Sequence, residues 1–173
     1  MVESLHDPEV LAKRLRDRLS QTPALLVGVD GWIGAGKTRL AYCMACRTGS
    51  HVIDLDDFLD GSQGMYLERL DYNRLGKLIR RYRDAGGSII IAGICLLAVL
   101  QKLPLKLDVL IYVKRINDHG QWIDKGECDE QEGGIPIGHS FPESVATAGK
   151  QVSRYHREFR PRSAADVIFV RTV

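Results

Sequence analysis

The chain has 173 residues, with 24 Lys and Arg against 22 Asp and Glu, a formal net charge of +2, and 45% hydrophobic residues. This length suits one compact domain with a substantial core, and the near-average composition excludes wholesale disorder and fibrous repeats. The small net charge gives no indication that nucleic acid is a partner. The four cysteines are too few for a disulfide scaffold.

Residues 1–20 are charged throughout and contain no apolar run typical of a signal peptide. The longest apolar stretch covers residues 89–100, whereas a membrane-spanning helix needs about 20 residues. We therefore expect a cytoplasmic protein with reduced thiols and no membrane association. The sequence leaves the oligomeric state open, and a homo-oligomer is compatible with it.

The first half of the chain alternates between helical and strand-like patterns. Residues 8–20 predict an amphipathic helix, with Asp7 as its cap and Pro8 at its first position. The apolar run 24–29 predicts a strand buried on both faces, followed by a glycine-rich turn and a helix over 37–47. A second strand is expected at 51–55, a loop at 56–68, and a helix at 71–85 that ends at two glycines.

The second half continues the alternation. Strands are expected at 88–92 and 107–113, and residues 126–142, rich in Gly, Pro and acidic residues, predict a long loop or lid. A helix at 143–159 ends before Pro161, and a last strand follows at 166–170. This order predicts a single α/β domain whose parallel sheet is covered on both faces and binds ligands at the carboxyl ends of its strands.

Residues 31–38, with the sequence GWIGAGKT, match the pattern GxxxxGK[ST] completely, after a predicted strand and before a predicted helix. Glycines let the backbone turn sharply and direct successive N–H groups at phosphate oxygens, and the helix adds its positive end. Lys37 can reach the β- and γ-phosphates, and Thr38 can hold Mg²⁺. The predicted nucleotide-binding residues are Gly31, Ile33, Gly34, Ala35, Gly36, Lys37, Thr38 and Arg39.

An acidic cluster follows the second predicted strand, where Asp56 and Asp57 would lie at the carboxyl edge beside the phosphate loop. A small-molecule kinase needs a carboxylate there to accept or orient the proton of the attacking hydroxyl. A solvated acidic turn is the simpler alternative. Next to the phosphate motif, the position favours Asp56 as a catalytic residue and Mg²⁺ ligand, with Asp57 orienting the substrate or holding metal-bound water.

Four segments occur in the order VGVDGWIGAGKT, VIDLDDF, SIIIAGICLL and YHREFRP with AAD. Together they resemble the uridine kinase and phosphoribulokinase-like family of P-loop small-molecule kinases over residues 24–170. The resemblance implies a three-layer α/β fold of the nucleoside-kinase type with a five-stranded parallel sheet. It also implies Mg²⁺ and ATP as cofactors, a nucleoside-like or sugar-like hydroxyl acceptor, and Asp56 as the general base.

One position departs from the family pattern. Relatives end the third strand in Glu before Gly-Ile, and this chain has Ala92 there. Ala can orient neither metal-bound water nor the acceptor. Three explanations remain open: an engineered inactive variant, a natural protein whose metal shell uses Thr38, Asp56 and Asp57, or a nucleotide-binding switch with little kinase activity. A GTPase is disfavoured because the chain has no NKxD-like motif.

Phosphoryl transfer spreads negative charge over the moving group, so basic side chains are expected above it. Lys37, Arg115 and Arg154 are the candidates, although cations near a helix C-terminus are also simply favourable there. Arg115 lies near the start of a lid expected over residues 114–142, in which His119 and Trp122 could close over a substrate.

The acceptor pocket should follow the catalytic carboxylate in the chain. Its aromatic members could stack on a ring, and its arginine could pair with an anionic group, while ordinary packing explains them equally well. The predicted substrate residues are Asp57, Phe58, Tyr66, Arg69 and Tyr72. The partner implied is therefore a small-molecule acceptor.

Overall fold

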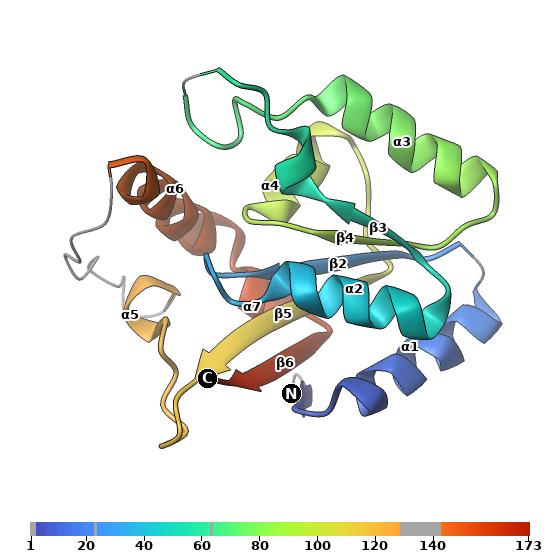
Figure 1. Cartoon of the computed structure of the whole chain (residues 1–173), viewed down its shortest axis with the longest axis horizontal. Coiled ribbons are helices and arrows are strands. Elements are labelled where there is room, and N and C mark those ends of the chain that lie inside the picture. The colour runs from blue at the N-terminus through green and yellow to red at the C-terminus, as the bar shows by residue number, and fades with distance from the viewer. Residues whose placement is uncertain (1–2, 23, 63, 129–142) are drawn as a thin grey trace.

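A six-stranded parallel sheet forms the centre of the computed structural model, which describes residues 3–22, 24–62, 64–128 and 143–173 (Figure 1). Its strands are β1 (Glu3–Leu5), β2 (Leu26–Gly31), β3 (His51–Asp54), β4 (Ile89–Ala92), β5 (Val109–Ile116) and β6 (Val167–Thr172). Their spatial order is β1-β6-β5-β2-β4-β3, and every neighbouring pair is parallel.

The prediction of five strands is wrong by one, because β1 was not expected. This strand has only three residues, and it pairs with β6 alone at one edge of the sheet. Its first two side chains, Glu3 and Ser4, are exposed, so the segment carries no apolar pattern. The other five strands overlap the predicted ones, and all of them bury apolar residues, from Ile53 alone in β3 to the whole of β4.

Helices cover both faces of the sheet and give the expected three layers (Figure 1). They are α1 (Pro8–Gln21), α2 (Lys37–Thr48), α3 (Tyr72–Asp84), α4 (Leu96–Lys102), α5 (Lys125–Cys128), α6 (Glu143–Phe159) and α7 (Pro161–Ala164). The core between α1, α2 and the sheet includes Leu11, Leu15 and Met44. The core on the opposite face includes Leu75 and Ile79 of α3.

Local signals explain the helix boundaries. The Asp7 side chain accepts a hydrogen bond from the Glu9 amide at 2.8 Å, with Pro8 in the first turn, as the sequence predicts. Helix α4 was not predicted. It follows β4 after three residues and buries Leu96, Val99 and Leu100, so its apolar run continues that of the strand without a visible break.

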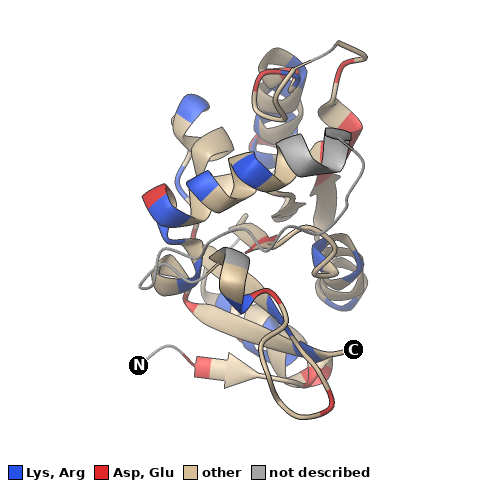
Figure 2. Ribbon diagram, turned by 90° about the vertical axis from the view of Figure 1, so that its left-hand side faces the viewer, with Lys and Arg blue, Asp and Glu red and all other residues tan. Residues whose placement is uncertain are grey.

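Strand β5 continues to Ile116, so residues 114–116 belong to the sheet rather than to the predicted lid. Residues 129–142 of that lid lie outside the described residues. Over the part of the chain that is described, no helix is long and apolar enough to cross a membrane. Lys and Arg residues lie on helices on both sides of the sheet, and acidic residues are interspersed with them (Figure 2).

Candidate functional site

The loop that the sequence predicts to bind phosphate connects β2 to α2, at the carboxyl edge of the sheet. Gly31 has a φ of 150°, and a Cβ atom there would lie 2.6 Å from the Val113 carbonyl oxygen. Gly36, the residue before α2, is left-handed with a φ of 94°. A side chain would be strained at both positions, so these glycines allow the loop to turn back into the helix.

Lys37 lies under this loop, and only 7% of the residue is exposed. Its ammonium group donates a hydrogen bond to the Trp32 carbonyl oxygen at 2.8 Å, across the loop. Burial lowers the pKa of Lys37, while the charges of Asp30, Asp56 and Asp54 oppose this decrease. The lysine is therefore held between the loop and nearby carboxylates, where it can meet an incoming phosphate.

Asp30 is a member of the site that sequence reasoning missed. It is fully buried, and it accepts hydrogen bonds from the Gly31 amide at 2.7 Å and from the Tyr155 hydroxyl. Burial raises the pKa of Asp30 to about 6. The Tyr155 oxygen also accepts a hydrogen bond from the Leu97 amide at 3.1 Å. The base of the loop is thus joined to α6 and α4. The feature of the sequence that could have revealed Asp30 is its position as the one acidic residue in an apolar strand.

The acidic edge begins at the end of β3. The Asp54 carboxylate accepts a hydrogen bond from the Asp56 amide at 3.1 Å and caps a short 3₁₀ helix, η1 (Leu55–Phe58). The exposed Asp56 accepts a hydrogen bond from the Tyr66 hydroxyl at 2.9 Å. Burial, followed by the charge of Asp56, raises the pKa of Tyr66. Tyr66 is therefore a permanent hydrogen-bond donor to the candidate base.

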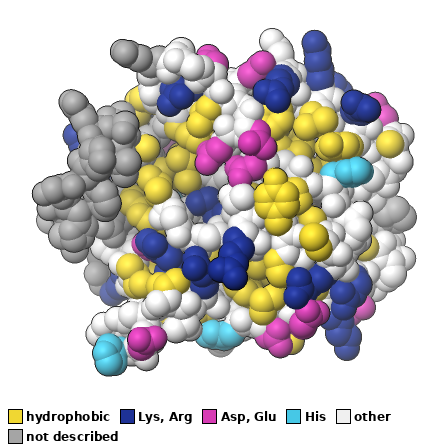
Figure 3. Space-filling model, in the orientation of Figure 1, with side chains coloured by type: hydrophobic (Ala, Val, Ile, Leu, Met, Phe, Trp, Pro, Cys, Tyr) yellow, Lys and Arg dark blue, Asp and Glu magenta, His cyan; other side chains and the backbone are white. Residues whose placement is uncertain are grey.

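Acidic and basic side chains gather on opposite sides of a hollow on this face of the molecule (Figure 3). The topology explains the separation, because β3 lies on one side of β2, and β5 and β6 lie on the other. Asp54 ends β3, whereas Arg115 and Arg171 lie near the ends of β5 and β6. The phosphate loop lies between these two groups.

Ala92 ends β4 and is fully buried. Its register partners are Val29 on β2 and Asp54 on β3. Residues paired in register point to the same face of a sheet, so Asp54 lies on the neighbouring strand beside the position where the family has Glu. The structure therefore supplies a carboxylate close to Ala92, from a residue that was not among the predicted ones.

The two arginines predicted to act on the phosphoryl group differ in their surroundings, because Arg115 lies next to the loop and Arg154 is exposed on α6. Arg115 donates to the Gly34 carbonyl oxygen at 3.5 Å and forms an ion pair with Asp124. The side chain of Arg154 is 74% exposed and forms an ion pair with Glu158, one turn along α6, at 2.7 Å. A catalytic role for Arg154 stays a prediction, since the structure shows this side chain only in its exposed ion pair with Glu158 on α6.

Among the predicted acceptor residues, Tyr66 contacts the candidate base and Asp57 is exposed beside it. Phe58 is only 4% exposed and packs under the Arg74 guanidinium, so its ring is not available for stacking on a ligand in this arrangement. The Tyr72 hydroxyl donates to the Leu67 carbonyl oxygen at 2.8 Å, which also indicates packing.

Arg69 is the predicted anion-pairing residue of the acceptor pocket. Its guanidinium donates to the Asp60 carbonyl oxygen at 2.9 Å, and its buried Nε has no hydrogen-bond partner.

The two predicted lid residues differ from each other. His119 is exposed, whereas the Trp122 ring has Lys114 and Arg162 within about 5 Å of its centre.

The residues of the site fit a magnesium ion of the kind that accompanies a nucleotide. The Thr38 hydroxyl lies in the first turn of α2, and Tyr66 binds only one of the two Asp56 carboxylate oxygens. No group of three His, Cys, Asp or Glu within the described residues could hold a metal ion. Mg²⁺ is usually bound by one or two protein oxygens together with phosphates and water, and the Thr38 hydroxyl and the second Asp56 oxygen are oxygens of this kind.

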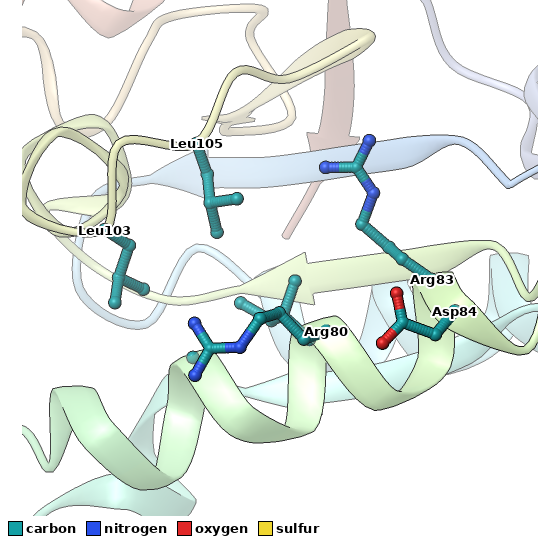
Figure 4. A pocket seen from close by; sticks show the side chains of 7 residues that line it. Arg80, Arg83, Asp84, Leu103 and Leu105 are labelled. Carbon is teal, nitrogen blue, oxygen red and sulfur yellow. The ribbon is translucent and has the colours of Figure 1, made fainter.

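A pocket of about 440 Å³ adjoins the loop on the β6 side. It is lined by Gly36, Arg39 and Cys43, by Phe169 and Arg171 of β6, and by His6 before α1. A second pocket, of about 380 Å³, lies between α3 and the segment after α4, where Arg80 and Arg83 extend toward Leu103 and Leu105 (Figure 4). Only the first pocket shares a residue with the phosphate loop.

The comparisons with solved structures show what fold this is. A structure described as a possible uridine kinase from Bacillus stearothermophilus aligns with a TM-score of 0.57 at 15% identity, over 94% of this chain and 96% of that chain. A sugar kinase from Janibacter sp. HTCC2649, unliganded, aligns with a TM-score of 0.51 at 22% identity, over 87% of this chain and 86% of that chain. This chain has the fold of P-loop small-molecule kinases. Neither a family model nor a curated protein matches the sequence.

Proposed function

We propose that this protein is a kinase that transfers a phosphoryl group from ATP to a hydroxyl of a small metabolite, nucleoside-like or sugar-like. The observation that carries the proposal is the placement of a buried Lys37 between a phosphate-binding loop and the carboxylates of Asp54 and Asp56. A loop of this kind alone would suit any nucleotide-binding protein. A carboxylate across from it is what a hydroxyl acceptor requires.

In the proposed reaction, the amides of residues 31–38 and the Lys37 ammonium bind the phosphates of ATP. Thr38 and Asp56 would hold Mg²⁺, which neutralises charge on the phosphates when it is bound. Asp56 accepts the proton of the attacking hydroxyl, and Tyr66 holds its carboxylate in place at 2.9 Å. Arg115, fixed by Asp124 beside Gly34, adds positive charge near the loop.

The nucleoside part of the phosphoryl donor would enter the pocket of about 440 Å³ beside the loop. The pocket begins at Gly36, and much of its remaining wall is apolar, with Leu40, Val113 and Phe169. A base and ribose need such a surface next to the phosphates. This side of the loop lies away from Asp56, so phosphoryl donor and acceptor would occupy opposite sides.

The experiment is a screen of hydroxyl metabolites with Mg-ATP that measures ADP release. A kinase produces ADP that depends on one class of acceptor, and the phosphorylated product then identifies the attacked hydroxyl. ATP hydrolysis that does not respond to any acceptor contradicts transfer to a metabolite. Failure of the protein to bind ATP at all contradicts the assignment of the loop.

A nucleotide-binding switch with little transfer activity is the second candidate function, and Ala92 is the observation that favours it. This residue is fully buried and provides no carboxylate at the end of β4. Asp54 in register on β3 weakens this alternative, because it restores a negative charge beside Lys37. The same screen separates the two functions, because a switch binds ATP tightly without any acceptor-dependent ADP.

A further inference from the structure

We propose that Arg171, near the end of β6, binds the phosphate of the nucleotide that lies nearest to the nucleoside. This role rests on the proposed function and extends it to a residue outside the loop motif. The register of β5 and β6 places Arg171 directly beside Arg115. Both guanidinium groups reach the loop, Arg115 at the Gly34 carbonyl oxygen and Arg171 at the Ala35 carbonyl oxygen, 3.4 Å away.

The two arginines differ in how their charge is compensated. Arg115 is paired with Asp124, whose carboxylate is almost completely buried. Arg171 has no carboxylate partner within 4 Å among the residues that the structure describes. Its bond to Ala35 is long for a hydrogen bond, so most of the donor capacity of its guanidinium remains available.

The surroundings of Arg171 add to its positive potential. A Cβ atom on Gly36 would lie 2.6 Å from the Arg171 Nη1 atom, so the guanidinium lies against the backbone at the start of α2. That end of the helix carries a partial positive charge of its own. A guanidinium beside it, together with the exposed Arg39, is unfavourable until an anion binds between them.

The topology determines which phosphate this would be. Asp56 follows β3 on one side of β2, and Arg171 ends β6 on the other side. The phosphate that is transferred must lie near Asp56, because the acceptor hydroxyl is there. A phosphate chain that starts near Asp56 and runs along the loop places the phosphate next to the nucleoside at Arg171. Arg171 also lines the pocket proposed for the nucleoside.

The test compares Arg171→Gln with the native protein by titration calorimetry, using Mg-ATP and Mg-pyrophosphate as two probes. Pyrophosphate fills the loop but does not extend to the phosphate next to the nucleoside. We expect ATP affinity to fall roughly tenfold, as for loss of a charge-assisted hydrogen bond, while pyrophosphate affinity stays within about twofold. Arg171→Lys keeps the charge but loses the planar fork of the guanidinium. Its ATP affinity should therefore lie between those of the native protein and Arg171→Gln.

Arg80→Gln on α3 is the matched control. Arg80 borders the other pocket, and its substitution removes the same charge as Arg171→Gln does. It should leave both affinities unchanged. Equal loss of ATP and pyrophosphate affinity in Arg171→Gln would show that Arg171 only supports the loop, and it overturns the proposal. Unchanged ATP affinity overturns it as well. If the native protein binds neither probe, the proposed function fails together with this inference.

If Arg171→Gln does not fold, the Lys variant decides alone. A selective loss of ATP over pyrophosphate supports the role of Arg171. Equal behaviour of the two probes contradicts it. Thermal melting of each variant without nucleotide establishes which protein preparations are folded.

Discussion

The phosphate-binding loop and the acidic segment after β3 face each other at one edge of the sheet, but they are held in different ways. The loop is fixed from beneath by buried groups, Lys37 bound to Trp32 and Asp30 bound to Gly31 and Tyr155. In the acidic segment Asp56 is exposed, and one bond from Tyr66 orients it. The side proposed to bind the nucleotide is therefore held by buried hydrogen bonds, whereas the side proposed to meet the acceptor is open to solvent.

The strongest test of this contrast is Asp56→Asn. The change should lower phosphoryl transfer about 10³-fold, because it removes the base that accepts the hydroxyl proton. The loop does not depend on Asp56 for its hydrogen bonds, so ATP affinity should remain close to that of the native protein. Steady-state ADP release and calorimetric ATP binding measure the two effects. Parallel loss of both would mean that Asp56 supports the fold of the loop.

The proposed nucleotide side can be tested through its two buried titratable groups, Asp30 and His156. Burial raises the pKa of Asp30 to about 6, so its protonation stabilises the fold at low pH and this contribution is lost as pH rises from 4 to 6. Burial lowers the pKa of His156 to about 4 from its usual 6.5, so its contribution is lost as pH falls through this range. The two effects are opposite in sign.

Each group changes the free energy of unfolding by about 3 kcal/mol between low and neutral pH, so the two changes nearly cancel in the native protein. Asp30→Asn removes one of them. From pH 7 to pH 4, its unfolding free energy should decrease by about 3 kcal/mol relative to the native protein. His156→Gln should show the reverse trend by a similar amount. Urea titrations at the two pH values measure these differences, and parallel pH profiles for all three proteins would contradict the burial of these charges.

The open side can be tested by Tyr66→Phe, which removes the one hydroxyl bound to Asp56 and keeps the ring. We expect kcat to fall about fivefold to tenfold, as for the loss of a hydrogen bond to a charged group, while ATP affinity remains unchanged. Tyr72→Phe is the control, since the Tyr72 hydroxyl is bound to the Leu67 carbonyl rather than to a carboxylate. Equal effects of the two variants on kcat would argue that Tyr66 acts only through packing.

The smallest effect is expected for Arg154→Gln. This side chain is largely solvated and forms an i,i+4 pair with Glu158. Such an exposed pair contributes little to stability, and kcat should change by less than about twofold. Thermal melting and ADP release measure both quantities. A large decrease in kcat would mean that the helix carries Arg154 into the site during turnover.

The proposed nucleotide side was predicted well from the sequence, because its geometry follows from local rules. Glycines at residues 31 and 36, a buried strand and a helix start are visible in one short segment. Asp30 and Arg171 were missed because their roles depend on partners far along the chain, Tyr155 and Ala35. Spacing along the sequence carries no information about such contacts.

The acceptor side was less predictable for a related reason. Phe58 and Tyr72 follow the candidate catalytic carboxylate closely, yet tertiary packing directs the first into the core and binds the hydroxyl of the second to the backbone. Tyr66 was correctly placed near Asp56, although nothing in the sequence distinguishes it from Tyr72. In the same way, the edge strand β1 has too few apolar residues to be recognised without its partner β6.

The hydrogen bonds at Asp30 connect the first amide of the phosphate loop to helix α6. The Gly31 amide is bound to one carboxylate oxygen, and Tyr155 of α6 is bound to the other. Deuterium can enter at Gly31 only when this buried assembly opens. The exchange rate of that single amide therefore reports how often the hydrogen bonds around Asp30 open, and a ligand that stabilises them should slow it.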